Sequence, residues 1–226
     1  MSKIEEQRKT DAERLVDAAL RHVPFDGMNN RALTAAAHDL GFEAAYARLL
    51  VPGGAAGLAT AYHRRQDDAL RQSLAENPPQ GRVRDRVTES VMRRLALSDP
   101  ELVRAGAAVM ALPGNAALGL RLLGETAGVI WDALGDASDD LAWWTKRASL
   151  GAVIGATVLY WLGDQSPDHA DSRAFLERRI DGMMRVEAAK ARLRKLPGWD
   201  RVAQATTGWV HAPEGAVMPA TEDRGA

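Results

Sequence analysis

Histidines are the first residues of this chain to test for chemistry, and their spacing argues against it. None of the five follows a glutamate by three residues, so the paired Glu-x-x-His motif of di-iron helical bundles is missing. No two histidines are spaced to bind zinc from one helix face, and the chain has no cysteine to supply a thiolate. The histidines are His22, His38, His63, His169 and His211. We therefore predict no catalytic histidine and no metal site.

The remaining polar clusters each have a structural interpretation. Three aspartates near the middle of the chain could form a metal or acid–base cluster: Asp136, Asp139 and Asp140. We favour Asp136 and Ser138 shaping a turn, with the other two aspartates complementing the N-terminal dipole of the next helix. The glycine-rich segment 52–57 lacks the Lys-Ser/Thr of a phosphate loop, and Ser138 and Ser166 have no obvious base. We expect no cofactor and no enzymatic activity.

The same region is rich in tryptophan. Segment 131–147 holds three of the six tryptophans and four aspartates, and it runs directly into the uncharged segment 148–163. Adjacent residues on a helix point about 100° apart, so Trp143 and Trp144 cannot both face inward. We expect at least one of them at the surface, where a large exposed aromatic side chain marks a contact site.

Composition and charge narrow the class of protein. The 226 residues are 46% hydrophobic and 26% charged, with a net charge of −1, which argues against a surface built for nucleic acid. Segment 1–14 lacks the apolar core of a secretory signal, and its acidic residues are unlike a mitochondrial presequence. Segment 148–163 is shorter than the roughly 20 residues that cross a bilayer. We expect a bacterial cytoplasmic protein.

Helical spacing recurs along almost the whole chain, and no segment alternates as a strand does. The pattern predicts an all-α bundle of about nine or ten helices. Proline and glycine should end the first helix at Pro24 and Gly27, and Asn30 or Thr34 should cap the second. Ser98 or Asp99 should cap the sixth, with Pro100 in its first turn. The predicted ranges are 5–22, a short helix through 38, 43–50, 55–76, 81–97, 100–112, 116–134, 139–162, 166–194 and 199–209.

The first 50 residues resemble the DNA-binding head of a TetR-type regulator. Segment 35–42 fits a helix-turn-helix, with small residues inside and Gly41 in the turn. The recognition helix would begin at Glu43 and would carry Arg48 as its only basic residue, whereas DNA binding needs several lysine or arginine contacts. We expect a degenerate head without a nucleic-acid partner. A ligand-responsive TetR-type transcription regulator is the alternative.

Segment 135–147 resembles a family signature. It reads Gly-Asp-Ala-Ser-Asp-Asp-Leu-Ala-Trp-Trp-Thr-Lys-Arg. The ubiquinone-biosynthesis CoQ-nine family typically has Gly-Asp-x-Ser-x-Asp-Phe-x-Trp-Tyr-Thr-Lys-Arg at this place. The resemblance continues through segments 163–168 and 175–181 and covers roughly 82–184. This sequence departs from the family pattern at Leu141, Trp144 and Ile154, where the family usually has phenylalanine, tyrosine and tyrosine.

The resemblance implies a TetR-like fold that serves as a lipid-binding accessory protein. Family members bind an isoprenoid quinone precursor in an apolar cavity and assist the di-iron demethoxyubiquinone hydroxylase. Their partner-facing patch maps to Ile130, Trp143 and Trp144, and their C-terminal amphipathic helix contacts the membrane. The implied organisation is a degenerate head at 1–54, a lipid-binding bundle at 55–196, and an amphipathic segment with a disordered tail at 197–226. A homodimer is possible.

Two neighbouring apolar helices could line such a cavity. Glycines at 119, 124, 128, 151 and 155 remove side-chain volume there, and the alternative is a close-packed core with glycine at helix crossings. The candidate lining residues are Leu118, Leu122, Val129, Leu150, Val153, Ile154, Thr157, Val158 and Trp161.

A basic segment near the C-terminus could contact a membrane. Segment 178–201 has eight basic and three acidic residues, a local net charge of +5. Basic side chains attract anionic headgroups, and tryptophan favours the bilayer interface. The candidate contacts are Arg192, Arg194, Lys195, Trp199 and Trp209. These would place the protein on the inner face of a bacterial membrane; a solvated helix face is the alternative.

Overall fold

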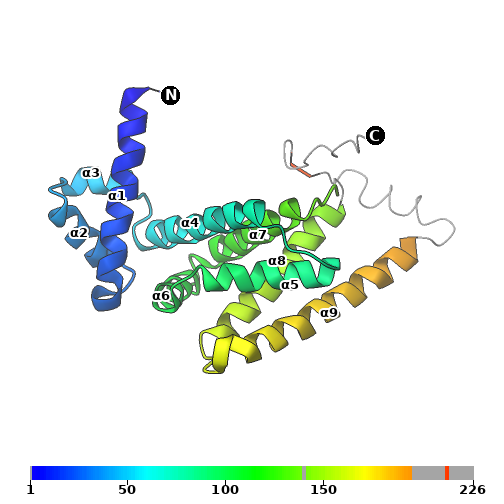
Figure 1. The fold of residues 1–226 in the computed structure, drawn as a ribbon. Coiled ribbons are helices and arrows are strands. Elements are labelled where there is room, and N and C mark those ends of the chain that lie inside the picture. Colours follow the sequence, from blue (N-terminus) through cyan, green and yellow to red (C-terminus); the bar gives the residue numbers. More distant parts are fainter. Residues whose placement is uncertain (1, 139–140, 195–211, 214–226) are drawn as a thin grey trace. The chain divides into compact units, whose positions relative to one another are not determined.

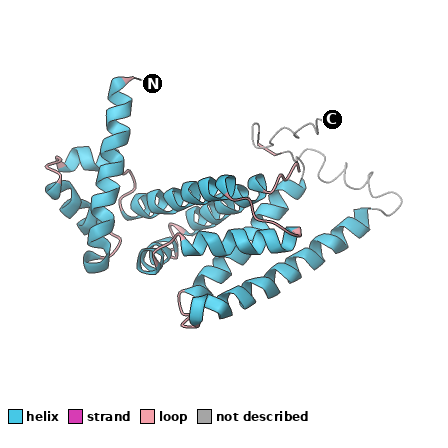
Figure 2. Cartoon of the chain, in the orientation of Figure 1, coloured by secondary structure: helices cyan, strands magenta, loops and turns pink. Residues whose placement is uncertain are grey.

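The computed structural model describes residues 2–138, 141–194 and 212–213, and this part of the chain is built from nine α-helices without a strand (Figures 1 and 2). The all-α prediction is therefore confirmed; the helix expected at 199–209 lies outside the described residues. The helices are α1 (Lys3–Asp26), α2 (Asn30–Asp39), α3 (Ala44–Leu50), α4 (Ala55–Glu76), α5 (Val83–Ala96), α6 (Pro100–Met110), α7 (Ala116–Ala133), α8 (Leu141–Trp161) and α9 (Ala170–Arg194), with a 3-10 turn η1 (Pro167–His169) before α9.

The ends of the first two helices differ from the prediction. Helix α1 continues through Pro24 to Asp26, because proline in a last turn removes few of the helix's hydrogen bonds. Gly27 then ends it with φ of +78°, a value that favours glycine. The cap of α2 is Asn29 rather than Asn30 or Thr34: its extended backbone lets Asn29 Oδ1 accept the backbone N–H of Arg31 at 2.7 Å.

The start of α9 also differs from the prediction. A single helix from residue 166 was expected, but η1 precedes α9, and Asp168 and His169 both have left-handed backbone angles. Asp164 fixes this turn. Its carboxylate accepts the backbone N–H of Ser166 at 2.8 Å and that of Ser172 at 2.9 Å. The predicted start of α6 is confirmed, with Asp99 Oδ1 accepting the backbone N–H groups of Glu101 and Leu102.

The chain divides into two compact units, one formed by Met1–Asp68 and Ala96–Leu122, the other by Ala69–Leu95 and Leu123–Ala226. The division falls inside α4 and α7, and not at residue 54, where the sequence suggested a boundary. No helix in the described residues is long and apolar enough to cross a membrane.

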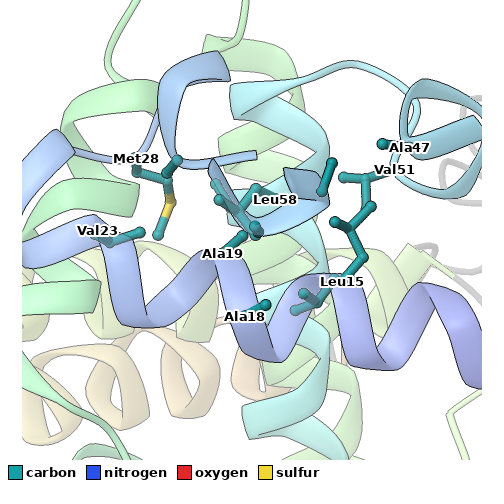
Figure 3. Close-up of a cluster of buried hydrophobic side chains, with 13 residues drawn as sticks. Leu15, Ala18, Ala19, Val23, Met28, Ala47, Val51 and Leu58 are labelled. Atoms are coloured by element: carbon teal, nitrogen blue, oxygen red, sulfur yellow. The ribbon is translucent and has the colours of Figure 1, made fainter. Parts of the chain in front are cut away.

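The first unit has a core of small aliphatic side chains. Helix α1 buries one apolar stripe, formed by Leu15, Ala18, Ala19 and Val23 (Figure 3). Alanines on α2 and α3 complete the cluster, which lets short helices pack closely against α1. The His22 ring, at the edge of this stripe, instead lies 2.7 Å from the Asp39 carboxylate.

The second unit is packed around α5, α7, α8 and α9. Its fully buried side chains include Val87 of α5, Ile130 of α7 and Leu150 of α8. Helix α5 has an apolar residue at every fourth position. Val87, Val91 and Leu95 are buried, whereas Val83 in its first turn is 47% exposed.

Glycines on α8 allow the backbone of α7 to come close. A Cβ atom added at Gly151 would lie 3.2 Å from the carbonyl oxygen of Leu123, and one added at Gly155 would lie 2.9 Å from Leu123 Cδ1. Contacts this short leave no room for a side chain. At these two positions the structure therefore has the close-packed helix crossing, not the space for a ligand. Gly124 differs, because an added Cβ would meet nothing within 4 Å.

These two kinds of glycine should respond oppositely to alanine. Gly151→Ala is expected to destabilise the fold by about 1–3 kcal/mol, since the new methyl group presses on the α7 backbone. Gly124→Ala should stabilise it by about 0.5–1 kcal/mol, because alanine is the better helix former in open space. Thermal unfolding followed by circular dichroism measures both. A Gly151→Ala variant as stable as wild type would contradict the close crossing.

The tryptophan turn as candidate functional site

The turn between α7 and α8 is closed by backbone hydrogen bonds. Gly135 has φ of +77°, and its N–H donates to the carbonyl of Asp132 at 3.0 Å, while the N–H of Asp136 donates to the carbonyl of Trp131 at 3.0 Å. This pair of bonds is the Schellman motif, which needs a left-handed residue at its centre. The chain therefore leaves α7 in one defined direction. We call residues 131–147 the tryptophan turn.

Asp136 is the acceptor that holds the tryptophan turn together. Its side chain is only 6% exposed, and its carboxylate accepts from Lys146 Nζ at 2.5 Å, Ser138 Oγ at 2.8 Å and Arg147 Nη1 at 3.3 Å. These three bonds join both ends of the turn through Asp136, as expected of a residue that shapes it. In the described residues no group of three metal-binding side chains comes together, and Asp139 and Asp140 lie outside them.

Arg147 links both helices to the turn. Its Nη2 donates to Asp132 Oδ1 of α7 at 2.6 Å, its Nη1 reaches Asp136, and its guanidinium lies 4.1 Å from the centre of the Trp143 ring. The side chain is 6% exposed, so these interactions are shielded from water. The positive charges of Lys146 and Arg147 are thus balanced by the carboxylates of Asp132 and Asp136. The family signature at 135–147 contains Asp136, Lys146 and Arg147 but not Asp132, and pairing across 10 to 15 residues was not assigned.

Hydrogen bonding sets the charge state of Asp136. Burial raises the pKa of this carboxyl, but hydrogen bonds from Lys146 and Ser138 and the positive charges of Lys146 and Arg147 outweigh burial. The net effect holds the pKa of Asp136 below its ordinary value. The carboxylate is therefore ionised at neutral pH and is unsuited to act as a general acid or base.

The three tryptophans of the turn lie at different depths. Trp131 is 8% exposed and donates its Nε1–H to the Lys146 carbonyl at 3.3 Å. Trp143 is half-buried, and Trp144 is 46% exposed and meets the Trp143 ring edge to face at 4.7 Å. The expectation of one tryptophan at the surface is confirmed for Trp144. Ile130 must be corrected: it is fully buried in the core, so its side chain has no surface to offer a partner.

The second motif of the family resemblance, around Asp164, also forms a structural turn. Hydrogen bonds from Ser172 and Ser166 outweigh the effect of burial and hold the pKa of Asp164 far below its ordinary value. Ser172 Oγ donates to Asp164 Oδ2 at 2.5 Å, so the carboxylate joins the end of α8 to the first turn of α9. This arrangement positions α9.

The predicted cavity residues fall in several environments. Leu118 lines a groove of about 790 Å³ in the first unit, together with residues of α1, α3 and α4 such as Val16, Leu50 and Arg64. On α8, the side chains of Val153 and Val158 are partly buried against the core. The other candidates are buried side chains: Leu122, Val129, Leu150, Ile154, Thr157 and Trp161. The residues are therefore apolar and mostly inaccessible in this conformation.

The predicted membrane contacts lie mostly beyond the described chain. Arg192 is exposed on α9, and Arg194 is the last residue of that helix. Lys195, Trp199 and Trp209 fall outside the described residues. The basic segment therefore stays a prediction.

The head contains the helix-turn-helix that the sequence suggested. Helices α2 and α3 are joined through Gly41, which has φ of +67°. Tyr46 of α3 donates its hydroxyl to Asp11 of α1 at 3.0 Å, which ties the second helix of the motif to α1. Arg48 is the one basic residue on α3, and Glu43 sits at its N-cap. The motif is present in shape but offers little positive charge to a phosphate backbone.

Comparison with known proteins places this geometry in a family. The COQ9 family model matches residues 116–187, a range that includes the tryptophan turn and the Asp164 turn. The chain belongs to the COQ9 family. Its match to the COQ9 ubiquinone biosynthesis protein of Drosophila melanogaster, named as mitochondrial, is 30% identical over 190 residues and covers 80% of this chain and 58% of that protein. The human COQ9 protein is 30% identical over 183 residues, with 76% and 57% covered.

Two further comparisons set the limits of the likeness. The chain spans little more than half the length of the COQ9 proteins of fly and human. A TetR transcriptional regulator from Nitrosomonas europaea aligns with a TM-score of 0.57 at 16% identity, covering 76% of this chain and 97% of the regulator. At this identity the likeness concerns the fold alone. The TetR-like prediction is confirmed.

The buried ion pairs of this COQ9-family chain predict a pH-dependent stability. Asp136→Asn is expected to lose about 3 kcal/mol at pH 7, because Lys146 and the buried Arg147 lose their shared counter-charge. The folded-state pKa is lowered, so the contribution is complete above the unfolded pKa of about 3.9 and disappears as pH falls through the folded value. Urea unfolding across this range should show the wild type converging on the variant.

Asp132→Asn is the matched control for this prediction. Asp132 also pairs with Arg147, but its side chain is 46% exposed, so water can replace it and the loss should be smaller. Equal losses for both variants, or a loss at Asp136 that does not shrink in acid, would contradict the dominant role of the buried carboxylate.

Proposed function

We propose that this COQ9-family chain acts in ubiquinone biosynthesis as an accessory protein without catalytic activity of its own. It binds an isoprenoid quinone precursor and presents it to the di-iron demethoxyubiquinone hydroxylase on the inner face of a bacterial membrane. The names of the relatives support the pathway, and the matched region includes the tryptophan turn. The observation that carries the proposal is a tryptophan pair held at the surface by a buried, charge-balanced network.

The tryptophan turn suits a docking surface because it is rigid before contact. Trp144 presents 46% of its surface, its neighbour Trp143 lies edge to face against it, and Arg147 covers the Trp143 ring. Tryptophan and arginine dominate the energetic centres of protein interfaces, and side chains fixed in advance lose little entropy on binding. Ile130 supports this surface from beneath instead of touching the partner.

Lipid binding is proposed for the apolar helices α7 and α8. Segment 148–163 carries no formal charge, and a prenyl tail placed along it would remove a large apolar area from water. Because Gly151 and Gly155 bring the two helices close together, the tail requires α8 to shift away from α7. Val153 and Val158, which are only partly buried, are the side chains that such a shift would uncover first.

Docking predicts separate effects for the two adjacent tryptophans. Trp144→Ala should weaken hydroxylase binding about 30-fold with little change in thermal stability, since the exposed ring acts mainly on the partner. Trp143→Ala should weaken binding and also lower the melting temperature, because its ring packs on the buried Arg147. Isothermal titration calorimetry with purified hydroxylase gives the affinities.

Phe25→Ala is the matched control for docking, because Phe25 is 88% exposed and lies on α1. It should leave hydroxylase affinity unchanged. A Trp144→Ala variant that binds as tightly as wild type, or one that unfolds, would contradict the assignment of Trp144 to the partner surface.

Lipid binding predicts a bound molecule in native mass spectrometry. Protein purified without detergent should carry an isoprenoid or phospholipid adduct, and Val153→Phe should reduce its occupancy by filling the space beside α8. Leu159→Phe is the control, because Leu159 is 69% exposed on the same helix and faces away from the core. Wild-type protein free of lipid under conditions that preserve weak complexes would count against the proposal.

The helix-turn-helix and the TetR-like fold favour a second candidate, a ligand-responsive transcription regulator. Its weakness is the recognition helix α3, where Arg48 stands alone among apolar side chains. Sequence-selective retardation of DNA that weakens steeply with salt would favour the regulator over the accessory protein.

A further inference from the structure

The end of α6 and the start of α7 form an apolar hairpin without a charge. Residues 105–120, which we call the α6–α7 tip, contain no acidic or basic side chain, and Arg104 and Arg121 bracket them. Leu112 in the connection is 56% exposed and Leu120 on α7 is 71% exposed. Helix α6 is apolar in composition, yet none of its residues is buried. Apolar surface of this kind in water marks a contact site.

One side of the tip is occupied by the first unit's core. Leu102, Ala105, Val109 and Met110 pack against that core, and Gly106 lies beside Met28, whose sulfur would be 3.7 Å from an added Cβ. The opposite side has no such cover. Its exposed residues are Arg104 and Ala108 on α6, Ala111, Leu112, Pro113 and Gly114 in the connection, and Ala116, Ala117, Leu120 and Arg121 on α7. On each helix these exposed residues form a stripe that is apolar near the connection and ends at an arginine, Arg104 on α6 and Arg121 on α7.

The backbone of the connection is largely satisfied within the tip itself. Asn115 donates its side-chain Nδ2–H to the Val109 carbonyl at 2.9 Å and its backbone N–H to the Leu112 carbonyl at 2.8 Å. The N–H of Gly119 donates to the Asn115 carbonyl at 2.9 Å. Transferring an unpaired backbone N–H or C=O group from water into hydrocarbon costs roughly several kcal/mol. The hydrogen bonds made by Asn115 and Gly119 therefore lower the cost of moving the α6–α7 connection out of water.

The length of the apolar stripes matches the depth of an interfacial contact. At about 1.5 Å per residue, Met110 at the end of α6 lies about 9 Å along the helix axis from Arg104, and Ala117 lies about 6 Å from Arg121. Amphipathic elements enter a bilayer by roughly 5–10 Å, and arginine side chains reach back to the headgroups. The stripes themselves contain no carboxylate; Glu101 lies a turn beyond Arg104 and Glu125 lies a turn beyond Arg121.

We propose that the α6–α7 tip is a membrane-contact site, in which Leu112 and Leu120 enter the interface of an anionic bilayer and Arg104 and Arg121 pair with lipid phosphates. The two arginines favour anionic lipid over a second copy of this chain, whose own tip would present the same positive charges. This site is separate from the basic segment that begins near Arg192. It needs neither the hydroxylase nor a bound quinone.

Single-cysteine labelling tests the site directly, because the chain contains no cysteine. An environment-sensitive fluorophore is attached to Leu112→Cys, Leu120→Cys or the control Leu49→Cys, which is 65% exposed on α3. Vesicles of phosphatidylcholine with phosphatidylglycerol are then added. We expect a blue shift and at least about a twofold rise in emission at positions 112 and 120, as water leaves the apolar surface, and no change at position 49.

Vesicle flotation of full-length variants gives the energetics. Leu112→Asp and Leu120→Asp should each lower binding about tenfold, because each leucine no longer enters the interface. Arg104→Gln and Arg121→Gln should each lower binding about fivefold on anionic vesicles and have no effect on pure phosphatidylcholine. Hydroxylase affinity measured without vesicles should stay unchanged in all four, so failure of this site and failure of the proposed docking are seen separately.

Three results would overturn the proposal. Vesicle-bound protein with unchanged labels at 112 and 120 would place membrane contact elsewhere. A label response that grows with protein concentration in the absence of lipid would make the tip a contact between copies. Protein that stays in solution with anionic vesicles would exclude membrane contact by the tip.

Discussion

The geometry of the proposed docking surface depends on one buried ion network. Asp136 can be buried because Lys146 and Arg147 donate to it, and Arg147 can be buried because Asp132 and Asp136 share its charge. Removing either the carboxylates or the cations would leave an unpaired buried charge, which costs several kcal/mol. The network joins the last turn of α7 to the first turns of α8. It also supplies the flat guanidinium on which the Trp143 ring rests.

The rest of the fold uses few aromatic side chains, and this makes their concentration informative. Only 5% of the chain is aromatic, and the first unit's core is built from alanine, valine and leucine. Half of the six tryptophans nevertheless lie in one 17-residue turn, where Trp144 stays exposed. The core of the first unit therefore contains no tryptophan, whereas Trp131 belongs to the core of the second unit. A contact that forms outside the core gives a reason for keeping exposed rings at this place.

Much of the fold could be predicted because its signals are local. Helix α4 was predicted between Pro52-Gly53-Gly54 and Asn77-Pro78-Pro79, and α6 from Asp99 and Pro100, with no knowledge of neighbours. Ile130 could not be placed, because the face that α7 buries depends on α5 and α8. The left-handed turn at Asp168 was also missed, since it depends on Ser172 reaching Asp164 eight residues away. Likewise, the sequence could not show whether Gly151 leaves space for a ligand or lets the α7 backbone pack against α8, because this depends on the position of α7.

Fold and function separate clearly in this chain. The TetR-like architecture retains α2 and α3 in helix-turn-helix form, yet α3 has lost the charge that DNA contact requires. The features that suit recognition lie elsewhere, and α7 carries both: Leu120 near its start belongs to the apolar tip, and Trp131 near its end belongs to the tryptophan turn. A protein that presents a nearly insoluble ligand must contact both the source of that ligand and its user. Under the proposed function, α7 meets both requirements, with its apolar, arginine-flanked end at the membrane and its tryptophan-rich end at the hydroxylase.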